Sequence, residues 1–532
     1  MKTRKSTLSD WLPAAAAIAA ALVGAINIGS ALTPEIRWRG HLLLEFEPVE
    51  AMRVFHALAL PAGAALLLVA PYLVKRRRRA WQVAILLMLA LGLFDLLKGL
   101  DFEETALTWG AAAVLFAGNS GFRVRHDPIT LRSALWRVPL LALVGFLAVA
   151  LANWVGDPRH GWIELAIHLV EVGTLISIAY VIFRPLAAPR TLPDPAARAL
   201  AAQVVRSHGT DSLSFFNLRA DKHYFFSHDA RAFVGYTIEN GVLLLSGDPV
   251  GPEEEIEALL QSVRAFAEVR GLKLGAVGAS ERTRPRYEEL GLKTLYLGDE
   301  AVIDLARFSL EGRPIRKVRQ SVTRLSKAGY TVELHELHGL APDQVAQVER
   351  VIEQGRLGAP ERGFSMAMDS ITGEHCDQTL VVLARDADGA IRGVLHFVPC
   401  YGRRAVSLSF MRRDPSTPNG LTEFLVARAA KLLREREIEE LSLNFATFAR
   451  WMHSPERWHE RLLGKLVALG NPFFQIESLY RFNAKFFPRW EPRYLVYEGP
   501  FGLPRVGLAA MWAEGQLPKP KLPQRRAPAA AS

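Results

Sequence analysis

Residues 380–398 read LVVLARDADGAIRGVLHFV, and this stretch indicates the architecture of the C-terminal half of the chain. Two runs of apolar and β-branched residues flank a short turn at residues 387–389, which is the pattern of a β-hairpin. A further strand is expected at residues 405–410, and a long helix is expected to begin at Asn419 and Gly420. A hairpin, a third strand and a helix together predict an α/β unit.

The same plan occurs earlier in the chain. Strands are expected at residues 235–239 and 241–246, and an amphipathic helix is expected to begin at Glu253. The whole α/β region is too long for one compact unit of this kind. We therefore expect two related folds, at residues 196–330 and 331–515.

Residues 287–292 read YEELGL and resemble the tyrosine, helix and glycine that end the GCN-five-related N-acetyltransferase fold. Enzymes with that fold bind the pyrophosphate of coenzyme A on a loop of the form R/Q-x-x-G-x-G/A. Residues 412–420 hold that place in the second half and contain one glycine. We therefore expect two acetyltransferase-like folds that use no cofactor. The chain also lacks the spacings HExxH and CxxC, so no metal is expected.

The apolar residues are concentrated before residue 185. Half of the chain is hydrophobic (50%) and only 22% is charged, which excludes a mainly disordered protein. A helix that crosses a membrane needs ~20 mostly apolar residues. Six segments reach or approach that length, at residues 11–32, 54–74, 81–97, 105–122, 138–155 and 162–183.

These segments predict an α-helical transmembrane bundle at residues 1–184. A Pro-rich linker is expected at residues 185–195, and a disordered tail rich in Pro and Ala at residues 516–532. Twelve Lys and Arg residues lie at one set of helix ends and three at the opposite set. Because cytoplasmic loops carry the excess of Lys and Arg, both termini are predicted to be cytoplasmic in a multi-pass protein of the cell membrane.

Several motifs resemble the aminoacyl-phosphatidylglycerol synthases, also called multiple peptide resistance factors. The resemblance is strongest to the lysyl-phosphatidylglycerol synthase type without a fused lysyl-tRNA synthetase. The matching stretches are DKHYFFS at 221–227, GDPVG at 247–251, GDEAVID at 298–304, ERGFS at 361–365, MRRDP at 411–415, PNG at 418–420, SLNFA at 442–446 and LYRFNAKFFPRWEPRY at 479–494.

The resemblance implies transmembrane helices followed by two tandem acetyltransferase-like folds, of which the second is catalytic. It implies transfer of an amino acid, with lysine favoured, from aminoacyl-tRNA to a hydroxyl of phosphatidylglycerol. The implied partners are the aminoacyl-tRNA, phosphatidylglycerol and the membrane lipid, and a separate aminoacyl-tRNA synthetase. A homo-oligomer is one possibility, on which the sequence itself gives no information. Two alternatives stay open: a flippase or transporter with a regulatory soluble domain, and an acyltransferase that acts on another acceptor.

One departure concerns the donor. The family often has an acidic residue three positions before the Arg of the Met-Arg-Arg motif, and Ser409 stands there in this chain. An acidic group would be a natural partner for a substrate ammonium, so Ser409 counts against lysine.

Aminoacyl transfer to an alcohol requires groups that bind two polyanions, stabilise an oxyanion and remove one proton. We assign Glu361 as the base or the ligand of the donor's α-ammonium, and Arg412 and Lys485 as catalytic cations. The tRNA's own 2′-hydroxyl is the alternative proton relay. The residues expected to bind substrates are Asp221, Lys222, Ser409, Asn419, Gly420, Asn444, Arg481 and Arg493. Each assignment has a simpler alternative. The cations could be ordinary surface charges, Asp221 and Lys222 could form a salt bridge, and Asn419 and Gly420 could only cap a helix.

Basic residues crowd another expected helix. They are Arg313, Arg316, Lys317, Arg324 and Lys327. Such a row of cations is typical of a surface that follows nucleic-acid phosphates, so we predict that it binds tRNA. The same row could face anionic lipid or only solvent. Residues 456–474 could likewise lie in the membrane interface or pack as an ordinary core helix.

Overall fold

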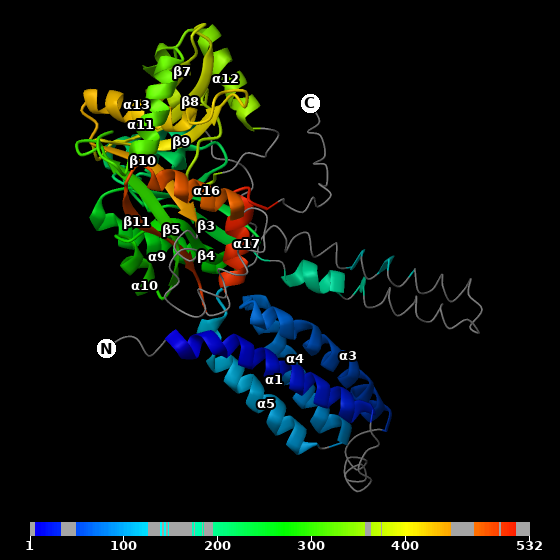
Figure 1. Cartoon of the computed structure of the whole chain (residues 1–532). Coiled ribbons are helices and arrows are strands. Elements are labelled where there is room, and N and C mark those ends of the chain that lie inside the picture. The colour runs from blue at the N-terminus through cyan, green and yellow to red at the C-terminus, as the bar shows by residue number, and fades with distance from the viewer. Residues whose placement is uncertain are drawn as a thin grey trace. The chain divides into compact units, whose positions relative to one another are not determined.

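The computed structural model describes residues 6–32, 49–99, 101–125, 195–356, 363–373, 375–447, 473–499 and 502–517, and short pieces between residues 139 and 185. The chain divides into two units (Figure 1). The N-terminal unit contains Met1–Ala188 and Ala265–Leu272. The C-terminal unit contains Pro189–Arg264 and Lys273–Ser532.

Four long helices are described in the N-terminal unit. They are α1 (Ser6–Leu32), α3 (Val49–Val74), α4 (Arg78–Gly99) and α5 (Phe102–Ala117). Helices α1 and α3 approach each other closely at Gly24 and Gly63, because a Cβ atom on Gly24 would lie 2.8 Å from the carbonyl oxygen of Gly63. Small residues that allow such an approach are typical of helix pairs in membranes.

Two stretches of these helices, Trp11–Ser30 and Arg78–Leu97, are long and apolar enough to cross a membrane. Pro61–Val74 of α3 is apolar but shorter. Large apolar side chains also stand exposed on this unit, among them Leu86 and Val114 at 66% and 70%. Apolar side chains exposed in such number suit contact with lipid. The expected helices at 138–155 and 162–183 lie mostly outside the described residues, so the six-helix bundle stays a prediction.

The C-terminal unit is built on one sheet. Its described strands are β1 (His223–Phe226), β2 (Phe233–Glu239), β3 (Val242–Ser246), β4 (Lys273–Ser280), β5 (Lys293–Asp304), β6 (Thr331–Glu336), β7 (Leu380–Arg385), β8 (Ile391–Cys400), β9 (Ala405–Arg413), β10 (Glu440–Thr447) and β11 (Arg489–Tyr497). Their order across the sheet is β1-β2-β3-β4-β11-β5-β10-β9-β8-β7-β6. The helices are α8 (Pro195–His208), α9 (Glu253–Arg270), α10 (Arg284–Glu289), α11 (Arg316–Lys327), α12 (Pro342–Arg356), α13 (Leu421–Glu435), α16 (Phe473–Ala484) and α17 (Leu503–Ala513).

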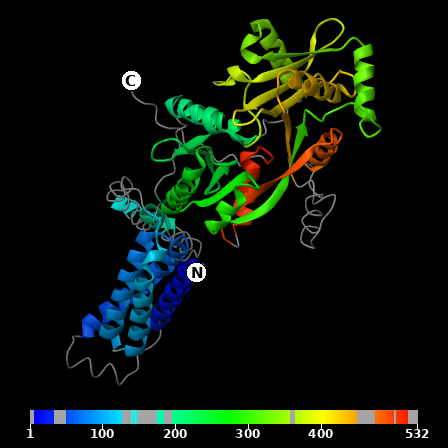
Figure 2. The same cartoon turned by 90° about the vertical axis from the view of Figure 1, so that its left-hand side faces the viewer.

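Each half of this sheet repeats the same plan. An antiparallel hairpin leads to a pair of parallel strands that are joined through a helix, namely β3-α9-β4 in the first half and β9-α13-β10 in the second. The last strand of each half then pairs with the other half. Strand β11 pairs with β4, strand β5 pairs with β10, and β5 and β11 pair with each other at the centre (Figure 2). The two halves are therefore joined by exchanged strands.

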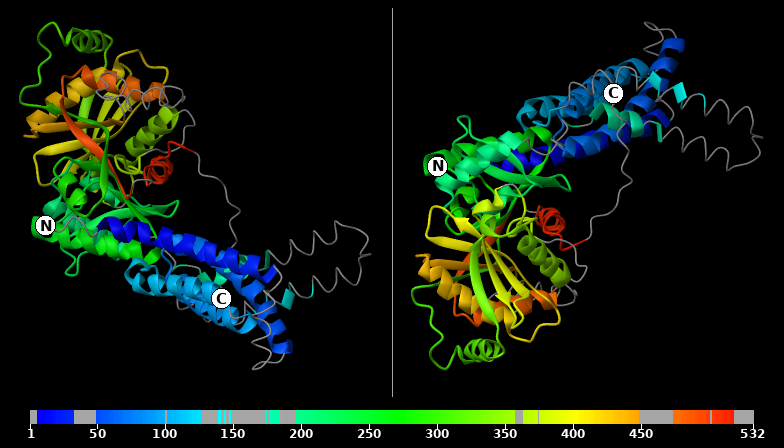
Figure 3. Two further views of the ribbon diagram at one scale, coloured as in Figure 1. Left: turned by 90° about the horizontal axis from the view of Figure 1, so that it is seen from below. Right: turned by 90° about the horizontal axis from the view of Figure 1, so that it is seen from above.

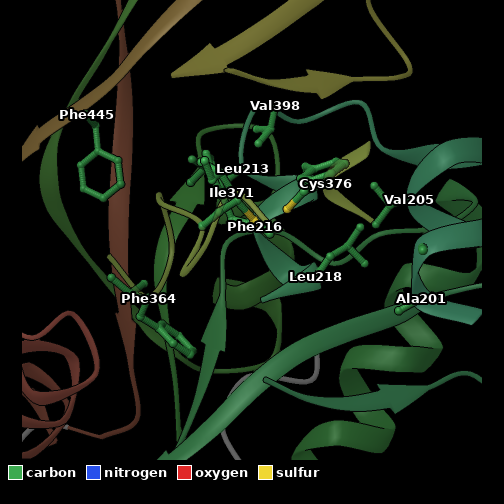
Figure 4. Packing of buried hydrophobic residues seen from close by; sticks show 14 of the residues in the cluster. Ala201, Val205, Leu213, Phe216, Leu218, Phe364, Ile371, Cys376, Val398 and Phe445 are labelled. Atoms are coloured by element: carbon green, nitrogen blue, oxygen red, sulfur yellow. The ribbon is translucent and has the colours of Figure 1, made fainter. Parts of the chain in front are cut away.

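Helices cover both faces of the sheet (Figure 3). Successive side chains of a strand point to opposite faces. Accordingly, Val381 and Leu383 of β7 belong to the hydrophobic core under α12, whereas Val382 and Ala384 belong to the core under α13. The segment after α12 also contributes Phe364 to the first of these cores, which contains residues of both halves (Figure 4).

A buried ion-pair network lies where the exchanged strands meet. Arg493 of β11 is only 2% exposed, and its guanidinium donates to Glu300 of β5 (Nε–Oε2 2.9 Å) and to Ser212 (2.8 Å). It also pairs with Asp211 at 2.9 Å. Burial alone would raise the pKa of Glu300, but Arg493 and hydrogen bonds from Ser212 and Ser442 hold that pKa below its ordinary value. The network therefore keeps charges of both signs in the core.

We expect Arg493→Met to destabilise the C-terminal unit by about 3–5 kcal/mol, because the substitution leaves buried carboxylates without a partner. Thermal unfolding of the full chain in detergent, followed by circular dichroism, measures this loss. The matched control is Arg489→Met on the same strand, whose side chain is 52% exposed and pairs with Glu440 and Glu491. The control should lose at most about 1 kcal/mol. Equal stability of the two variants would contradict a central role for Arg493.

Candidate active site

The strands β9 and β10 separate in the second half of the sheet. They are paired only from Ala405 to Ser407 and then diverge. In β9 the register shifts so that Ser409 has no opposite residue on β8, which is a β-bulge. In β10 the register shifts next to Asn444, which has a left-handed backbone with φ of +67°. Bulges leave backbone groups out of the ladder, and they often lie beside active sites.

Residues 363–369 run past this opening, and we call them the strap. The side-chain amide of Asn444 donates to the carbonyl oxygens of Met366 (2.6 Å) and Leu408 (3.0 Å). The hydroxyl oxygen of Ser409 accepts a hydrogen bond from the backbone N–H of Met368 (2.9 Å). The structure thus brings Ser409 and Asn444 to the same opening, where both side chains hold protein backbone.

A cavity of 330 Å³ lies between α12, the strap and β9. Its lining includes both cations and carboxylates. The lining residues are Glu349, Ile352, Glu353, Arg356, Ala367, Met368, Asp369, Ser370, Ile371, Phe410 and Arg412. Its size and mixed lining suit a small polar ligand group that carries charges of both signs.

Arg412 is the predicted catalytic residue that the structure places in this cavity. Its guanidinium donates to the carbonyl oxygen of Met411 (2.9 Å) and, within the part of the chain described, forms no ion pair. Partial burial lowers the pKa of Arg412, and the nearby Arg356 lowers it further. An arginine in this setting would gain from an anionic ligand, which its planar fork can bind.

The apolar part of the cavity wall rests on a buried histidine. The ring of Phe410 lies 4.9 Å from the ring of His396, centre to centre. A ring nitrogen of His396, Nε2, lies 3.0 Å from the hydroxyl oxygen of Thr379. Burial lowers the pKa of His396 to about 3, so the histidine is neutral and adds no charge behind the wall.

Two of the other predicted cations are already paired. Lys485 forms an ion pair with Glu423 of α13 at 2.7 Å, rather than lining the cavity. Arg493 is buried in the central network, so our expectation that it binds a substrate phosphate does not fit its position. Arg481 lies exposed on α16. Glu361 and residues 456–472 lie outside the described residues.

Neither Asp221 nor Lys222 lines the cavity. Lys222 is fully buried, and its ammonium donates to the carbonyl oxygen of Phe364 (2.6 Å) and to the hydroxyl of Ser246. Asp221 forms an ion pair with Arg219 at 3.0 Å. The salt-bridge alternative therefore describes Asp221, whereas Lys222 has a structural contact that the sequence did not indicate.

Asn419 and Gly420 form the start of α13, where they pack against α11. Gly420 has a φ of +91°, and a Cβ atom there would lie 2.6 Å from the hydroxyl oxygen of Ser321. The carbonyl oxygen of Asn419 accepts a hydrogen bond from Arg324. Glycine is required at this helix start by conformation and by the close approach.

The five predicted tRNA-binding cations are all exposed. Arg313 precedes α11, and the others lie on that helix, which buries Val318, Val322 and Leu325 on its opposite side. Apart from Arg324, their charged groups form no ion pair or side-chain hydrogen bond in the described part of the chain. We name these five cations the basic face.

Sequence reasoning missed the cavity carboxylates and the residues that hold the strap. Glu349, Glu353 and Arg356 lie on an amphipathic helix, whose polar side gives no hint of a cavity. The sequence does carry a signal for Glu514, because it is a single carboxylate at the end of the apolar run of α17. It is buried, and its carboxylate accepts a hydrogen bond from the backbone of Phe364.

Two halves with one plan, a bulged strand and a separated pair of parallel strands define a protein with tandem acetyltransferase-like folds. A family model described as "Phosphatidylglycerol lysyltransferase, C-terminal" matches residues 201–497, and the chain belongs to this family.

Relatives and solved structures agree with this assignment. The chain is 33% identical over 513 residues to the lysylphosphatidylglycerol biosynthesis bifunctional protein LysX of Gordonia bronchialis, covering 85% of this chain and 45% of that protein. It is 30% identical over 568 residues to LysX of Mycobacterium tuberculosis, covering 97% and 48%. The chain thus spans about half the length of the curated relatives that it matches.

The solved structure of L-PGS from Bacillus licheniformis is 20% identical, covers 62% of this chain and 99% of its own, and has a TM-score of 0.56. The C-terminal domain of a putative lysylphosphatidylglycerol synthetase from Agrobacterium fabrum is 25% identical, covers 59% and 94%, and has a TM-score of 0.51. These similarities confirm the expected acetyltransferase-like fold of the C-terminal half.

Proposed function

We propose that this chain transfers lysine from lysyl-tRNA to a hydroxyl of phosphatidylglycerol and so makes a cationic membrane lipid. The observation that carries the proposal is Arg412, which lies without an ion-pair partner among the described residues in a cavity beside the separated strands. The family match at residues 201–497 favours this reaction over a transporter and over an acyltransferase with another acceptor.

In the proposed reaction a lipid hydroxyl attacks the ester carbonyl of lysyl-tRNA. The new bond joins the lipid oxygen to the lysyl carbonyl carbon, and the bond to the ribose oxygen breaks. The proton of the lipid hydroxyl ends on that ribose oxygen, either through Glu361 or through the neighbouring 2′-hydroxyl of the tRNA. Arg412 binds the lipid phosphate or the oxyanion that forms during the attack.

The cavity also offers partners for lysine despite Ser409. The carboxylates of Glu349, Glu353 and Asp369 line it together with Arg412. Carboxylates bind an ammonium through charge-assisted hydrogen bonds, and this does not depend on which element carries them. We propose that these side chains take the place of the acidic residue that Ser409 replaces.

The decisive experiment is expression in a bacterial host that has no aminoacylated lipids, followed by lipid extraction. We expect a new ninhydrin-positive, cationic derivative of phosphatidylglycerol. Arg412→Ala should reduce its rate of formation by about 100- to 1,000-fold, the usual loss when a donor that stabilises a developing oxyanion is removed. The control is Arg404→Ala, an exposed arginine between β8 and β9. If the folded wild-type chain makes no such lipid from lysyl-tRNA, the proposed function fails.

We further propose that the basic face binds the tRNA. Its free cations would neutralise phosphates and release counterions, which makes affinity depend on salt. We also propose that a separate synthetase supplies the lysyl-tRNA. We further propose that the chain forms a homo-oligomer.

Replacing Arg316, Lys317 and Lys327 with Gln should raise the KM for lysyl-tRNA. It should also make the dependence of log affinity on log salt shallower by about 0.7–0.9 for each phosphate that the protein no longer neutralises. Filter binding at several salt concentrations measures this slope. The matched triple control is Arg307→Gln, Arg404→Gln and Lys431→Gln, which are also exposed. If both triple variants change the slope equally, the basic face is not the tRNA site.

We propose that the N-terminal unit crosses the membrane six times and leaves both termini in the cytoplasm. The domain limits are those expected from the sequence, with the bundle at 1–184, the linker at 185–195, the two folds at 196–330 and 331–515, and the tail at 516–532. Support comes from the apolar helices α1 and α4 and from the uneven distribution of Lys and Arg.

Cysteine labelling tests this topology, because Cys376 and Cys400 are both buried. We expect Arg37→Cys to react with a membrane-impermeant maleimide in intact cells and Lys75→Cys to react only after lysis. Labelling of Lys75→Cys in intact cells would contradict the proposed orientation.

A further inference from the structure

The strap is held by a buried lysine of the first half. Lys222 precedes β1, and its ammonium donates to the carbonyl oxygen of Phe364 at 2.6 Å. The same ammonium lies 3.3 Å from the centre of the Phe364 ring and also bonds the hydroxyl of Ser246 on β3. The side chain of Lys222 is fully buried, and this burial lowers its pKa to about 7.

The strap is held from a second side by the residue that follows α17. The carboxylate of Glu514 accepts hydrogen bonds from the backbone N–H of Phe364 (2.8 Å) and of Ser365 (3.1 Å), and from the Ser365 hydroxyl. Burial raises the pKa of Glu514, and the nearby Lys222 acts in the opposite direction. The lysine and the carboxylate therefore hold the carbonyl and the N–H of the same residue.

Two further contacts hold the end of the strap that reaches the cavity. Arg219 donates to the carbonyl oxygen of Ala367 at 2.7 Å. The backbone N–H of Ala220 donates to the carboxylate of Asp369 at 3.1 Å. Ala367 and Asp369 both line the cavity, so the first half contacts the cavity wall directly.

Burying a lysine and a glutamate is energetically expensive compared with an apolar pair of similar volume. The strap already places Phe364 in the hydrophobic core, so these charges are not needed merely to bury it. Their contacts are instead directional, and they define one position for the backbone that continues into the cavity wall. Support of this kind is what a precisely arranged site requires.

We propose that Lys222 and Glu514 are positioning residues, which fix the strap so that Ala367, Met368 and Asp369 form one wall of the substrate cavity. The first half is then a scaffold for the site of the second half. This inference rests on the proposed function where it concerns the reaction, and it is independent of that function where it concerns the strap.

The test uses the full-length double variant Lys222→Met and Glu514→Gln. Either single variant leaves one buried charge without the opposite charge near it and can fail to fold. The double variant removes both charges, so it should melt close to the wild type. It lacks the lysine contact to Phe364 and keeps only one of the two acceptor oxygens at position 514. We expect the KM for phosphatidylglycerol in mixed micelles to rise about tenfold, since the displaced wall lies in the lipid cavity. The KM for lysyl-tRNA should rise as well, because the displaced wall carries Asp369, one of the three carboxylates proposed to hold the donor's ammonium. It should rise less than the lipid KM, because Glu349, Glu353 and the basic face are untouched.

The matched control is another lysine–glutamate pair of the same unit. Lys273 of β4 and Glu498 after β11 form an ion pair at 3.2 Å, away from the strap and the cavity. The double variant Lys273→Met and Glu498→Gln should keep both KM values. A lipid KM that rises equally in the two double variants would overturn the proposal, as would an unchanged lipid KM in the Lys222 and Glu514 variant.

Hydrogen exchange gives a readout that needs no activity. The amides of Phe364 and Ser365 should exchange about tenfold faster in the Lys222 and Glu514 double variant than in the wild type, because one neutral amide oxygen replaces two carboxylate acceptors and the Lys222 contact is lost. Unchanged exchange would overturn the proposal. If instead the wild type makes no lysyl lipid while exchange at these amides accelerates as expected, the proposed function fails and the positioning of the strap stands.

Discussion

The buried pair between Arg493 and Glu300 is the interaction on which the C-terminal unit depends. It joins β11 to β5 at the centre of the sheet, where the last strand of each half pairs with the other half. A buried arginine is tolerated only when carboxylates and hydroxyls meet its donors, and Asp211 and Ser212 complete that set. Because Arg493 belongs to the second half and these partners all belong to the first, the buried charges are satisfied only when the two halves are together. The two folds are therefore one structural unit.

This dependence extends from the sheet to the candidate active site. The second half supplies the separated strands, the bulge at Ser409 and the cation of Arg412. The first half supplies contacts to the strap, including those of Lys222 and Arg219. The exchanged strands fix the two halves relative to one another. A shift of one half would disturb both the Arg493 network and the contacts to the strap. The repeat thus gives one supported site rather than two equal sites.

Local patterns in the sequence predict the hairpins, the helices and the order of elements. Residues 380–398 show such a pattern, because a strand that is covered on both faces reads as a short continuous apolar run. The strand exchange is not predictable in this way, since β11 pairs with strands about 200 residues earlier. Arg412 could be selected because it follows an apolar strand. The sequence does not distinguish Arg412 from Arg493 and Lys485. Arg493 pairs with Glu300 and Lys485 pairs with Glu423, but a cation in an internal ion pair looks the same in sequence as one that binds a ligand.

The same limit explains why Ser409 is weak evidence against lysine. A single motif position shows which residue is absent there, but recognition of an ammonium depends on where carboxylates gather in space. Glu349 and Glu353 come from α12, and Asp369 comes from the strap. All three are therefore far from Ser409 in sequence and lie on other elements. Asp369 also accepts a hydrogen bond from Ala220. The first half therefore holds one of the cavity carboxylates, and under the proposed function donor selection would depend on both halves.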